Sequence, residues 1–475
     1  MRSLNPWWQG RSLAAEPFRR SVYRQCRRSL EHPSLSRVVL LRGPRRVGKT
    51  TLLKQIAEHL LTEREVPPER VFYLALNHPV LKGESLRSLV DLYHEGITPR
   101  GPGVYLLLDE VQQVDGWQQD LGRLMDEGPG YRVLAAGAGP LWPPPGADAT
   151  GVGRWVPVGM PVLSFFEYAH LLGKTDGLPE FMQLGSFAQR KPEDLAEVAA
   201  SFESLRPLLG HYLLAGGFPE AARQASIGEA LGYFQREVIE RVLYPGGGLV
   251  QGVRKPEHLE RLVLYLCLNA GKPFSPEACA QALASNRGTV LSHLEALESA
   301  QLIARIPPYR PGGRKVQRAR DLVHLADAAL RNAVLMRGME VLDEPVEAGL
   351  LVEGAVFRHV RAAYARDMPI LGYWHDPASN RKVDLVAGSP GRIRALAVTY
   401  RSHAPVDPKG DLAAFLAREH GAVAAYQITR DDADFGVTRL PGVSAPVLRI
   451  PAHIFLYAVG MSEQRVAAGA EDAGL

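Results

Sequence analysis

The sequence has few cysteines and no long hydrophobic run. Its three cysteines are scattered over 475 residues, and none forms a CxxC pair or a Cys/His cluster with zinc-ligand spacing: Cys26, Cys267 and Cys279. This pattern predicts no disulfide framework and no structural metal, and it favours a reducing compartment. The N-terminus lacks a continuous apolar signal segment, and no stretch of about 18 uninterrupted apolar residues follows. We therefore expect a cytoplasmic protein without a membrane span.

The sequence also lacks a strong overall charge, since its formal net charge is +4. The charge is unevenly distributed, because the first 60 residues contain thirteen Lys or Arg and three Glu. Such a basic stretch is either a solvated helix or a contact for an anionic partner such as nucleic acid. The length predicts roughly two to four domains, each with enough apolar residues for a core.

The segment "GPRRVGKT" (43–50) follows the apolar run "VVLL" and precedes the amphipathic stretch "LLKQIAEHLL". Its spacing is that of a phosphate-binding loop between a strand and a helix. Lys49 would reach the β- and γ-phosphates of ATP, and Thr50 would hold Mg²⁺. The alternative is a glycine-rich turn that happens to contain Lys-Thr. The predicted nucleotide-binding residues are Gly43, Pro44, Arg45, Arg46, Val47, Gly48, Lys49, Thr50 and Thr51.

An acidic pair, Asp109-Glu110, ends the apolar run "VYLLLDE" about sixty residues after the loop. At the carboxyl end of a buried strand, Asp109 would bind Mg²⁺ and Glu110 would orient the attacking water. The alternative role of such a pair is to cap a helix N-terminus. Because the pair follows a phosphate loop, we favour the catalytic interpretation and predict Glu110 and Lys49 as catalytic residues.

Short apolar runs separated by helical stretches predict a parallel sheet with crossover helices. After the strand at 38–41, these runs lie at 71–77, 103–110, 131–137 and 154–160. Further along, the segment 256–330 predicts a helix-turn-helix followed by a two-stranded wing. Val290, Leu294, Leu297 and Leu302 form its predicted apolar face.

The predicted wing is basic and suits phosphate contacts, which supply affinity without sequence information. Its candidate DNA-binding residues are Arg305, Arg310, Arg314, Lys315, Arg318 and Arg320. The preceding helix carries Glu295 and Glu298, which would repel phosphates. Sequence-independent DNA binding therefore stands beside the alternative of a structural or protein-binding winged helix.

The chain resembles the prokaryotic ATPases of the AAA+ and STAND-like group. The resemblance rests on "NPWW" (5–8), "RGPRRVGKTTLLKQ" (42–55), "LLLDEVQQVDGWQQDLGRLMD" (106–126), "GRWVPVGMPVLSFFEYA" (153–169), "YLLAGGFPEA" (212–221), "LLVEGAVF" (350–357) and "KVDLV" (382–386). It implies a P-loop ATPase core joined to a winged helix and a domain resembling PD-(D/E)xK nucleases. ATP hydrolysis coupled to rearrangement of an assembly, often near DNA, is the implied activity.

Two segments near the implied ATPase site compare differently with that group. The first departs from its pattern, and the second keeps it. Where relatives have a Thr-Gly-Ser sensor of the γ-phosphate, this chain has Ala136, Gly137 and Ala138, which predicts slow hydrolysis. The Gly-Arg that follows in relatives is present as Gly153-Arg154. Arg154 is the third candidate catalytic residue, acting on a neighbouring subunit, although a salt-bridged surface arginine is the alternative.

The implied nuclease-like domain keeps only part of its metal site. Glu353 and Asp384 match the helix glutamate and strand aspartate of the pattern, whereas Ala397 and Thr399 stand where glutamate and lysine are needed. Phosphodiester cleavage needs metal charge on the attacking and leaving oxygens. We therefore expect a degenerate site that does not cut DNA.

The predicted fold is α/β, with a P-loop parallel sheet, a helical connector, a winged helix-turn-helix and a restriction-nuclease-like α/β domain. The predicted segments are a basic N-terminal extension (1–35), the ATPase domain (36–172), the connector (173–250), the winged helix (251–330), the nuclease-like domain (331–460) and a disordered tail (461–475).

Our functional hypothesis is a Mg²⁺-dependent ATPase that uses ATP to drive an oligomeric, DNA-associated machine for DNA remodelling or translocation. The expected cofactors are ATP and Mg²⁺, and the expected partners are DNA, further copies of the chain and a protein partner. The second hypothesis is a STAND-like switch, in defence or signalling, whose assembly is set by ATP binding and reset by slow hydrolysis. A transcription factor with a nucleotide sensor is less favoured, because nothing marks a base-reading helix.

Overall fold

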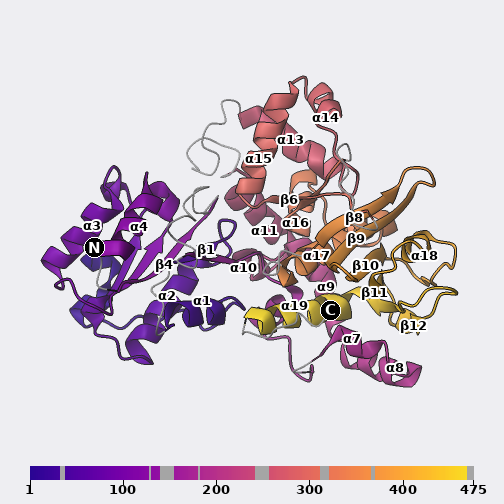
Figure 1. The fold of residues 1–475 in the computed structure, drawn as a ribbon, viewed down its shortest axis with the longest axis horizontal. Helices are drawn as coiled ribbons and strands as arrows, with labels where there is room; N and C mark the ends of the chain where they lie inside the picture. Colours follow the sequence, from indigo (N-terminus) through magenta and orange to yellow (C-terminus); the bar gives the residue numbers. More distant parts are fainter. Residues whose placement is uncertain are drawn as a thin grey trace. The chain divides into compact units, whose positions relative to one another are not determined.

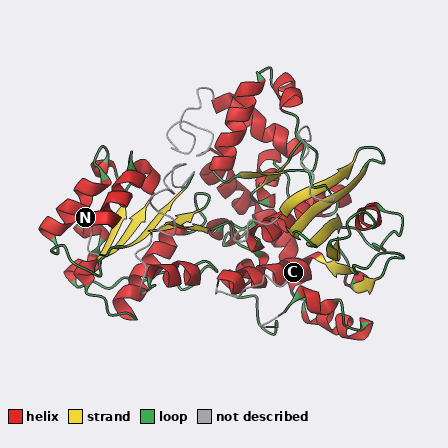
Figure 2. Ribbon diagram, in the orientation of Figure 1, coloured by secondary structure: helices red, strands yellow, loops and turns green. Residues whose placement is uncertain are grey.

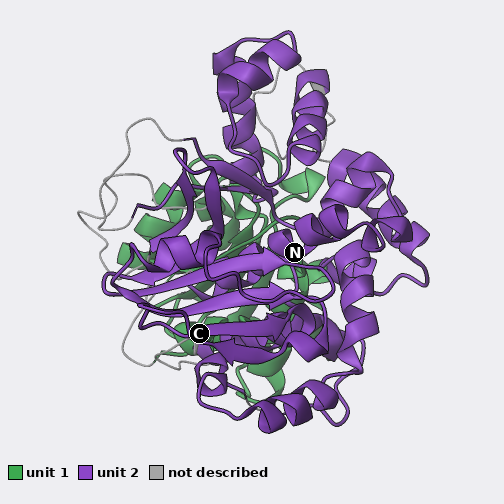
Figure 3. Ribbon diagram, turned by 90° about the vertical axis from the view of Figure 1, so that its right-hand side faces the viewer, with its two compact units in different colours: residues 1–161, 467–469 green, residues 162–466, 470–475 purple. Residues whose placement is uncertain are grey.

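The computed structural model describes residues 1–32, 38–127, 130–139, 155–179, 182–240, 256–310, 320–364 and 370–467. The chain divides into two compact units, one formed by residues 1–161 and the other by residues 162–466 (Figure 3). In the described part of the chain, no helix is long and apolar enough to cross a membrane. Helices and strands occur in both units (Figure 2).

The first unit is built on a parallel sheet with the strand order β2-β3-β4-β1-β5. β2, β3, β4 and β5 each fall within a predicted apolar run, and β1 extends the run at 38–41 by Arg42. β3 and β4 are almost wholly buried, which explains their continuous apolar runs, whereas the edge strand β5 is partly exposed. The parallel sheet predicted from the sequence is therefore confirmed. The strands are β1 (Val38–Arg42), β2 (Val71–Ala75), β3 (Tyr105–Asp109), β4 (Arg132–Gly137) and β5 (Trp155–Gly159).

Helices lie on both faces of this sheet (Figure 1). On one face, α3 (Leu86–Gly96) and α4 (Trp117–Glu127) bury side chains against alternate strand residues such as Val38 and Leu40. On the other face, α1 (Tyr23–Leu30) and α2 (Lys49–Thr62) contact the strands. The short 3₁₀-helices of this unit are η1 (Arg2–Leu4), η2 (Pro6–Gln9), η3 (Pro68–Arg70), η4 (Pro79–Leu81) and η5 (Val111–Gln113).

The "NPWW" segment covers the edge strand β2. The Asn5 side chain acts like one residue of a neighbouring strand, because its Nδ2 donates to Tyr73 O (2.9 Å) and its Oδ1 accepts from Tyr73 N (2.8 Å). Trp7 Nε1 donates to Val71 O at 2.9 Å. These bonds satisfy backbone groups that an uncovered edge would leave open to another strand.

The second unit contains a mixed sheet with the order β12-β13-β11-β10-β9-β8. β10, β11 and β13 are parallel neighbours, and the remaining pairs are antiparallel. This finding confirms a C-terminal α/β part with a sheet of its own. The strands are β8 (Ile370–Asp376), β9 (Arg381–Ser389), β10 (Arg392–Thr399), β11 (Ala422–Thr429), β12 (Gly436–Thr438) and β13 (Val447–Pro451).

Helices pack on the mixed sheet. α18 (Asp411–Leu416) buries Phe415 against Trp374 and the other residues of one apolar cluster. α17 (Pro345–Ala363) contacts β9 and β10. α19 (Ala452–Ala467) carries Phe455, whose ring centroid lies 5.8 Å from that of Tyr426 on β11.

The prediction of a disordered tail from residue 461 is wrong for residues 461–467, because α19 continues to Ala467. Met461 is buried, and Glu463 pairs with the buried Arg358 at 2.6 Å. The partner lies 105 residues away in sequence, so local composition does not indicate it. Residues 468–475 are outside the described residues.

The helical segment between the two sheets begins directly after residue 161. α6 (Phe165–Leu171) belongs to the second unit, because Leu163 N donates to Gly217 O (2.6 Å) and Phe165 N donates to His359 Nε2 (2.8 Å). The division at residue 161 therefore differs from the predicted domain end at residue 172. The other elements are α7 (Leu184–Phe187), α8 (Pro192–Ser201), α9 (Leu205–Ala215), α10 (Pro219–Ala222), α11 (Ile227–Tyr233), the π-helix η6 (Phe234–Glu240), α16 (Ala328–Leu335), η7 (Met339–Leu342) and η8 (Asp432–Asp434).

Three further helices and an antiparallel ribbon follow residue 255. The helices are α13 (Pro256–Leu268), α14 (Pro276–Ala282) and α15 (Arg287–Ser299), and β6 (Ile303–Ile306) pairs with β7 (Leu322–Leu325). The predicted apolar face is buried, with Val290, Leu294 and Leu297 about 1% exposed and Leu302 9% exposed. Residues 311–319, at the predicted wing tip, are outside the described residues.

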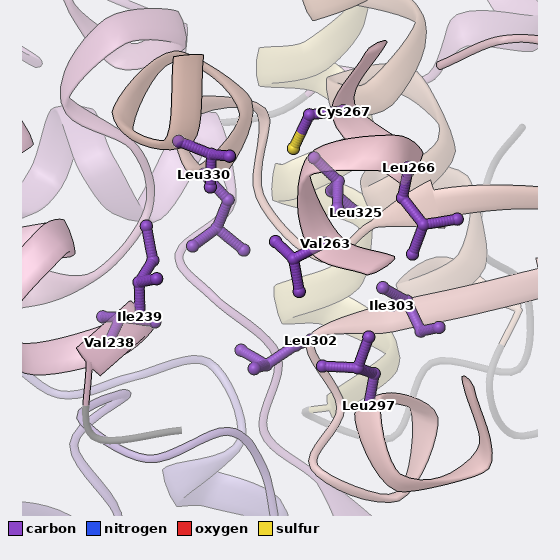
Figure 4. A pocket seen from close by; sticks show the side chains of 11 residues that line it. Val238, Ile239, Val263, Leu266, Cys267, Leu297, Leu302, Ile303, Leu325 and Leu330 are labelled. Carbon is purple, nitrogen blue, oxygen red and sulfur yellow. The ribbon is translucent and has the colours of Figure 1, made fainter. Parts of the chain in front are cut away.

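The core of this helical segment surrounds a small apolar cavity of about 30 Å³ (Figure 4). Side chains from η6, α13, α15, the ribbon and α16 converge on it, among them Val263, Leu297 and Leu330. The buried Cys267 thiol lines the same cavity, and burial raises its pKa to about 12. All three cysteines are buried, and none of them forms a disulfide.

Candidate functional site

The loop between β1 and α2 has the conformation that its glycines permit. A Cβ on Gly43 would lie 2.2 Å from Met160 O, so no larger residue fits there. Gly48 has φ +100°, a left-handed conformation that favours glycine. The loop leads directly into the N-terminus of α2 at Lys49, where unpaired backbone N–H groups and the helix dipole favour an anion.

Lys49 is buried at the start of α2. Its Nζ donates to Gly43 O (2.9 Å) and Pro44 O (2.7 Å), so the ammonium is folded into the loop. Burial lowers the pKa of Lys49 to about 8, although the charges of Glu110 and Asp109 oppose this shift. A phosphate group could replace the two carbonyls as the partner of this ammonium.

Thr50 and Asp109 meet at the carboxyl edge of the sheet, because β4 alone separates β1 from β3. Thr50 Oγ1 donates to Asp109 Oδ2 at 2.6 Å. The other carboxylate oxygen, Oδ1, is buried and has no hydrogen-bond partner among the described residues. A hydroxyl beside a buried carboxylate with a free oxygen fits Mg²⁺, which binds through one or two carboxylates and a phosphate.

Tyr73, which our sequence reasoning missed, also contacts Asp109. Its hydroxyl donates to Asp109 Oδ2 at 3.1 Å from the neighbouring strand β2. Burial raises the pKa of Asp109, and the hydrogen bonds from Thr50 and Tyr73 counteract that shift. The apolar run "VFYLAL" contained the tyrosine, but its role depends on the strand order, which the run does not specify.

Glu110 occupies an unusual backbone conformation directly after β3. Its φ is +55°, which costs a residue other than glycine some conformational energy and often marks a functional position. Its Oε2 accepts a hydrogen bond from Gln112 Nε2 at 2.5 Å. The Asp-Glu pair thus ends the strand, and the charges of both carboxylates raise the pKa of Lys49 against the effect of its burial.

Arg20 supports the loop from the N-terminal segment. Its Nη1 donates to Val47 O (2.7 Å) and its Nη2 donates to Pro161 O (2.6 Å). The side chain is buried at 6% exposure. This arginine is therefore part of the internal framework of the site, although the sequence suggested only a general basic surface.

Of the other predicted ATPase residues, the structure describes those at 136–138 but not Arg154. Ala136 ends β4 with Gly137, and Ala138 follows, so no side-chain hydroxyl stands at these three positions. Arg154 lies outside the described residues, and its predicted role is untested.

The structure describes some of the predicted DNA-binding residues and not others. Arg305 pairs with Glu298, with Nε at 2.8 Å and Nη2 at 2.6 Å from Oε2. Arg310, after β6, and Arg320, before β7, are exposed on the tip side of the ribbon. Arg314, Lys315 and Arg318 lie outside the described residues. On α15, the exposed Arg287 pairs with Glu277 at the surface, and His293 is buried and cannot reach a base edge.

The predicted degenerate nuclease pair is brought together. Glu353 on α17 and Asp384 on β9 line one small cavity. Ala397 and Thr399 lie on the adjacent strand β10, so that strand adds no carboxylate or ammonium at these positions.

Two of the markers of the resemblance, "LSFFEY" (163–168) and "GGFPE" (216–220), meet in the second unit. Gly217 N donates to Asp327 Oδ2 at 2.6 Å, and its carbonyl accepts from Leu163 N. Asp327 caps α16, and burial raises its pKa to about 6. A Cβ on Gly216 would approach Phe234 to 2.6 Å. These markers are explained by tight packing.

Two segments of the chain match family models of known protein domains. Residues 35–169 match a family model described as an AAA domain, and residues 206–340 match a domain of unknown function (DUF8612).

The similar full-length proteins are distant. An uncharacterised protein of Methanocaldococcus jannaschii is 27% identical over 331 residues, which cover 67% of each chain. An uncharacterised protein of Haemophilus influenzae is 24% identical over 306 residues, covering 62% of this chain and 68% of the other. Among solved structures, AMPPCP-bound DnaA from Aquifex aeolicus aligns with a TM-score of 0.29 and 17% identity, covering 63% of this chain and 93% of that chain. The match at residues 35–169 identifies an AAA domain in the N-terminal part of the chain, and an AAA domain implies nucleotide binding.

Proposed function

We propose that the chain is a Mg²⁺-dependent ATPase whose ATP binding and hydrolysis drive an oligomeric, DNA-associated machine. The observation that carries the ATPase part is the Thr50–Asp109 contact of 2.6 Å beside the buried Lys49 ammonium. These groups come from the start of α2 and the end of β3, so one edge of the sheet gathers a cation, a hydroxyl and two carboxylates.

Each group has a role in phosphoryl transfer. The backbone of residues 43–48 and the N-terminus of α2 bind the phosphates, and Lys49 neutralises charge between the β- and γ-phosphates. Thr50 and Asp109 hold Mg²⁺, which supplies charge neutralisation when bound. Glu110 orients and polarises the attacking water. Arg154 of a neighbouring subunit stabilises the charge that develops in the transition state.

ATP affinity should fall at alkaline pH. Burial lowers the pKa of Lys49 to about 8 in the nucleotide-free protein, whereas bound phosphate requires the charged ammonium. Binding must therefore recover a proton as the pH rises through 8, so affinity should fall by about twofold between pH 7 and 8 and by roughly tenfold per pH unit well above pH 8. Calorimetry at pH 7.5 and 9.5 measures this, with Lys49→Arg as the variant that cannot lose its charge. Equal wild-type affinities at both pH values would contradict the assignment.

The DNA part of the proposal rests on α13–α15 and the ribbon, which we assign as a winged helix-turn-helix. The end of the ribbon nearer the tip is attached to the mixed sheet, since Tyr309 N donates to Tyr373 O at 2.6 Å and the Tyr373 hydroxyl donates to Arg320 O at 2.5 Å. A basic tip held by such a base suits contacts with phosphates of any sequence. Because Arg305 is paired with Glu298, we assign phosphate contact mainly to the residues nearer the tip.

Reversing two charges at the tip should weaken DNA binding on all sequences alike. We expect Arg314→Glu with Lys315→Glu to reduce the salt dependence of binding by a slope of about 2. The matched control, Arg401→Glu with Lys409→Glu, changes the same charge at two exposed positions in the same unit. Fluorescence anisotropy over a range of salt concentrations measures the slope. Unchanged binding by the tip variant would move the DNA contact elsewhere, with the basic first 60 residues as the next candidate.

A STAND-like switch is the second candidate function. It is favoured by the absence of hydroxyl side chains at Ala136 and Ala138 and by the bond between Gln112 and the Glu110 carboxylate, both of which suit slow hydrolysis. Steady-state ATPase assays with and without duplex, single-stranded and branched DNA separate the two. Strong stimulation by DNA supports the machine, whereas tight ATP retention with negligible turnover supports the switch.

A further inference from the structure

A lysine joins the two carboxylates of the nuclease-like cavity. Lys382 Nζ lies 3.0 Å from Asp384 Oδ1 and 3.4 Å from Glu353 Oε1. Lys382 and Asp384 are two residues apart on β9, so their side chains share one face of the strand. The cluster is largely enclosed, because the Glu353 and Asp384 side chains are only 12% and 19% exposed.

The ammonium has a third oxygen partner from a distant segment. Lys382 Nζ donates to Gly271 O at 3.2 Å, in the turn between α13 and α14. That turn fits closely against α17, since a Cβ on Gly271 would lie 3.0 Å from Leu350 Cδ2. The second oxygen of Asp384 accepts from Val398 N at 2.8 Å. The partners of the ammonium and of Asp384 are thus supplied by one turn, one helix and two strands.

A buried histidine, His324, stands beside the two carboxylates. It lines the same cavity as Glu353 and Asp384, it is 6% exposed, and its Nε2 has no hydrogen-bond partner among the described residues. Burial and the Lys382 charge lower the pKa of His324 to about 3, so the imidazole is neutral. Its ring stacks on that of Phe357, with 4.3 Å between the ring centroids. Among the described residues, however, no group of three or more His, Cys, Asp or Glu side chains is arranged to hold a metal ion, so the imidazole does not complete a metal site with the two carboxylates.

We propose that the Lys382 ammonium is a built-in cation that takes the place of a divalent metal between Glu353 and Asp384. The ammonium supplies the positive charge that two enclosed carboxylates require. It also repels a second cation from the same oxygens. An ammonium has no vacant coordination position, so it cannot activate water or stabilise a leaving oxygen. The cavity is therefore an ionic joint between the turn at Gly271, α17 and the mixed sheet, and DNA is not cut there.

Removing the ammonium should create a divalent metal site. The probe is Mn²⁺ added to the nucleotide-free full chain at pH 7.5, with free Mn²⁺ measured by electron paramagnetic resonance. We expect Lys382→Met to gain one Mn²⁺ site at least about tenfold tighter than any in the wild type, because the repelling charge is gone. That site should be absent from the double variant Lys382→Met with Asp384→Asn. Lys382→Arg, the charge-preserving control, should bind no additional Mn²⁺.

Two results would overturn the proposal. One is a Lys382→Met protein that is folded by circular dichroism yet binds Mn²⁺ no better than the wild type. The other is a wild-type Mn²⁺ site that disappears in Asp384→Asn, because the ammonium would then not occupy the position. If Lys382→Met does not fold, Lys382→Gln keeps a donor for Gly271 O and removes the charge. If neither folds, identical Mn²⁺ titrations of wild type and Asp384→Asn support the proposal, and different titrations contradict it.

Discussion

Lys49→Ala is expected to abolish ATP binding. The ammonium is the buried cation of the loop and already lies within 3 Å of two loop carbonyls, at 2.9 Å and 2.7 Å. Removing it would leave the phosphates without their closest positive side chain in a water-poor site, where an unpaired charge costs several kcal/mol. We therefore expect a loss of roughly a hundredfold or more in affinity, measured by calorimetry with ATP and Mg²⁺.

The matched control is Lys54→Ala, which removes an exposed lysine from the same helix. It should bind ATP as the wild type does. Thermal unfolding of both variants checks that the loss reflects the site and not the fold, since the Lys49 side chain is itself buried. Unchanged ATP affinity of a folded Lys49→Ala protein would show that the loop does not bind the phosphates.

Glu110→Gln should stop turnover and keep ATP bound. The amide preserves the size of the side chain and its backbone conformation, but it cannot polarise water as a carboxylate does. General-base contributions are typically about 10² to 10⁴ in rate, so we expect hydrolysis to fall by at least about a hundredfold. Affinity for ATP should change only a few-fold, because Lys49, Thr50 and Asp109 are intact.

Asp115→Asn is the control for this variant, since it removes an exposed carboxylate close by in sequence. Phosphate-release kinetics and filter binding of labelled ATP measure turnover and retention on the same samples. A Glu110→Gln protein that hydrolyses ATP at the wild-type rate would remove Glu110 from the catalytic role and leave the base unassigned.

Local sequence signals predicted the parts of the fold that depend on neighbouring residues. The run "VVLL" followed by "GPRRVGKT" specifies a strand, a loop and a helix start, and the structure has β1, the loop and α2 there. The acidic pair after "YLLL" marks the end of β3 for the same reason. Alternation within "KVDLV" places Lys382 and Asp384 on one face of β9, but this alternation does not show that the lysine pairs with both carboxylates.

The residues that escaped prediction act across long sequence separations. Tyr73 reaches Asp109 through the pairing of β2 with β3, and Arg20 reaches Pro161 across 141 residues. Glu463 pairs with the buried Arg358, and the last helix continues through this position into the predicted disordered tail. In each case the side chain type was visible in the sequence, but its partner depended on the tertiary arrangement.

The most direct test of the ATPase assignment is phosphate release from ATP by the full chain, measured beside Lys49→Ala and Glu110→Gln. The assignment predicts release by the wild type with Mg²⁺, none when the metal is removed by EDTA, and none by either variant under both conditions. Release by the folded Lys49→Ala protein at the wild-type rate would contradict it.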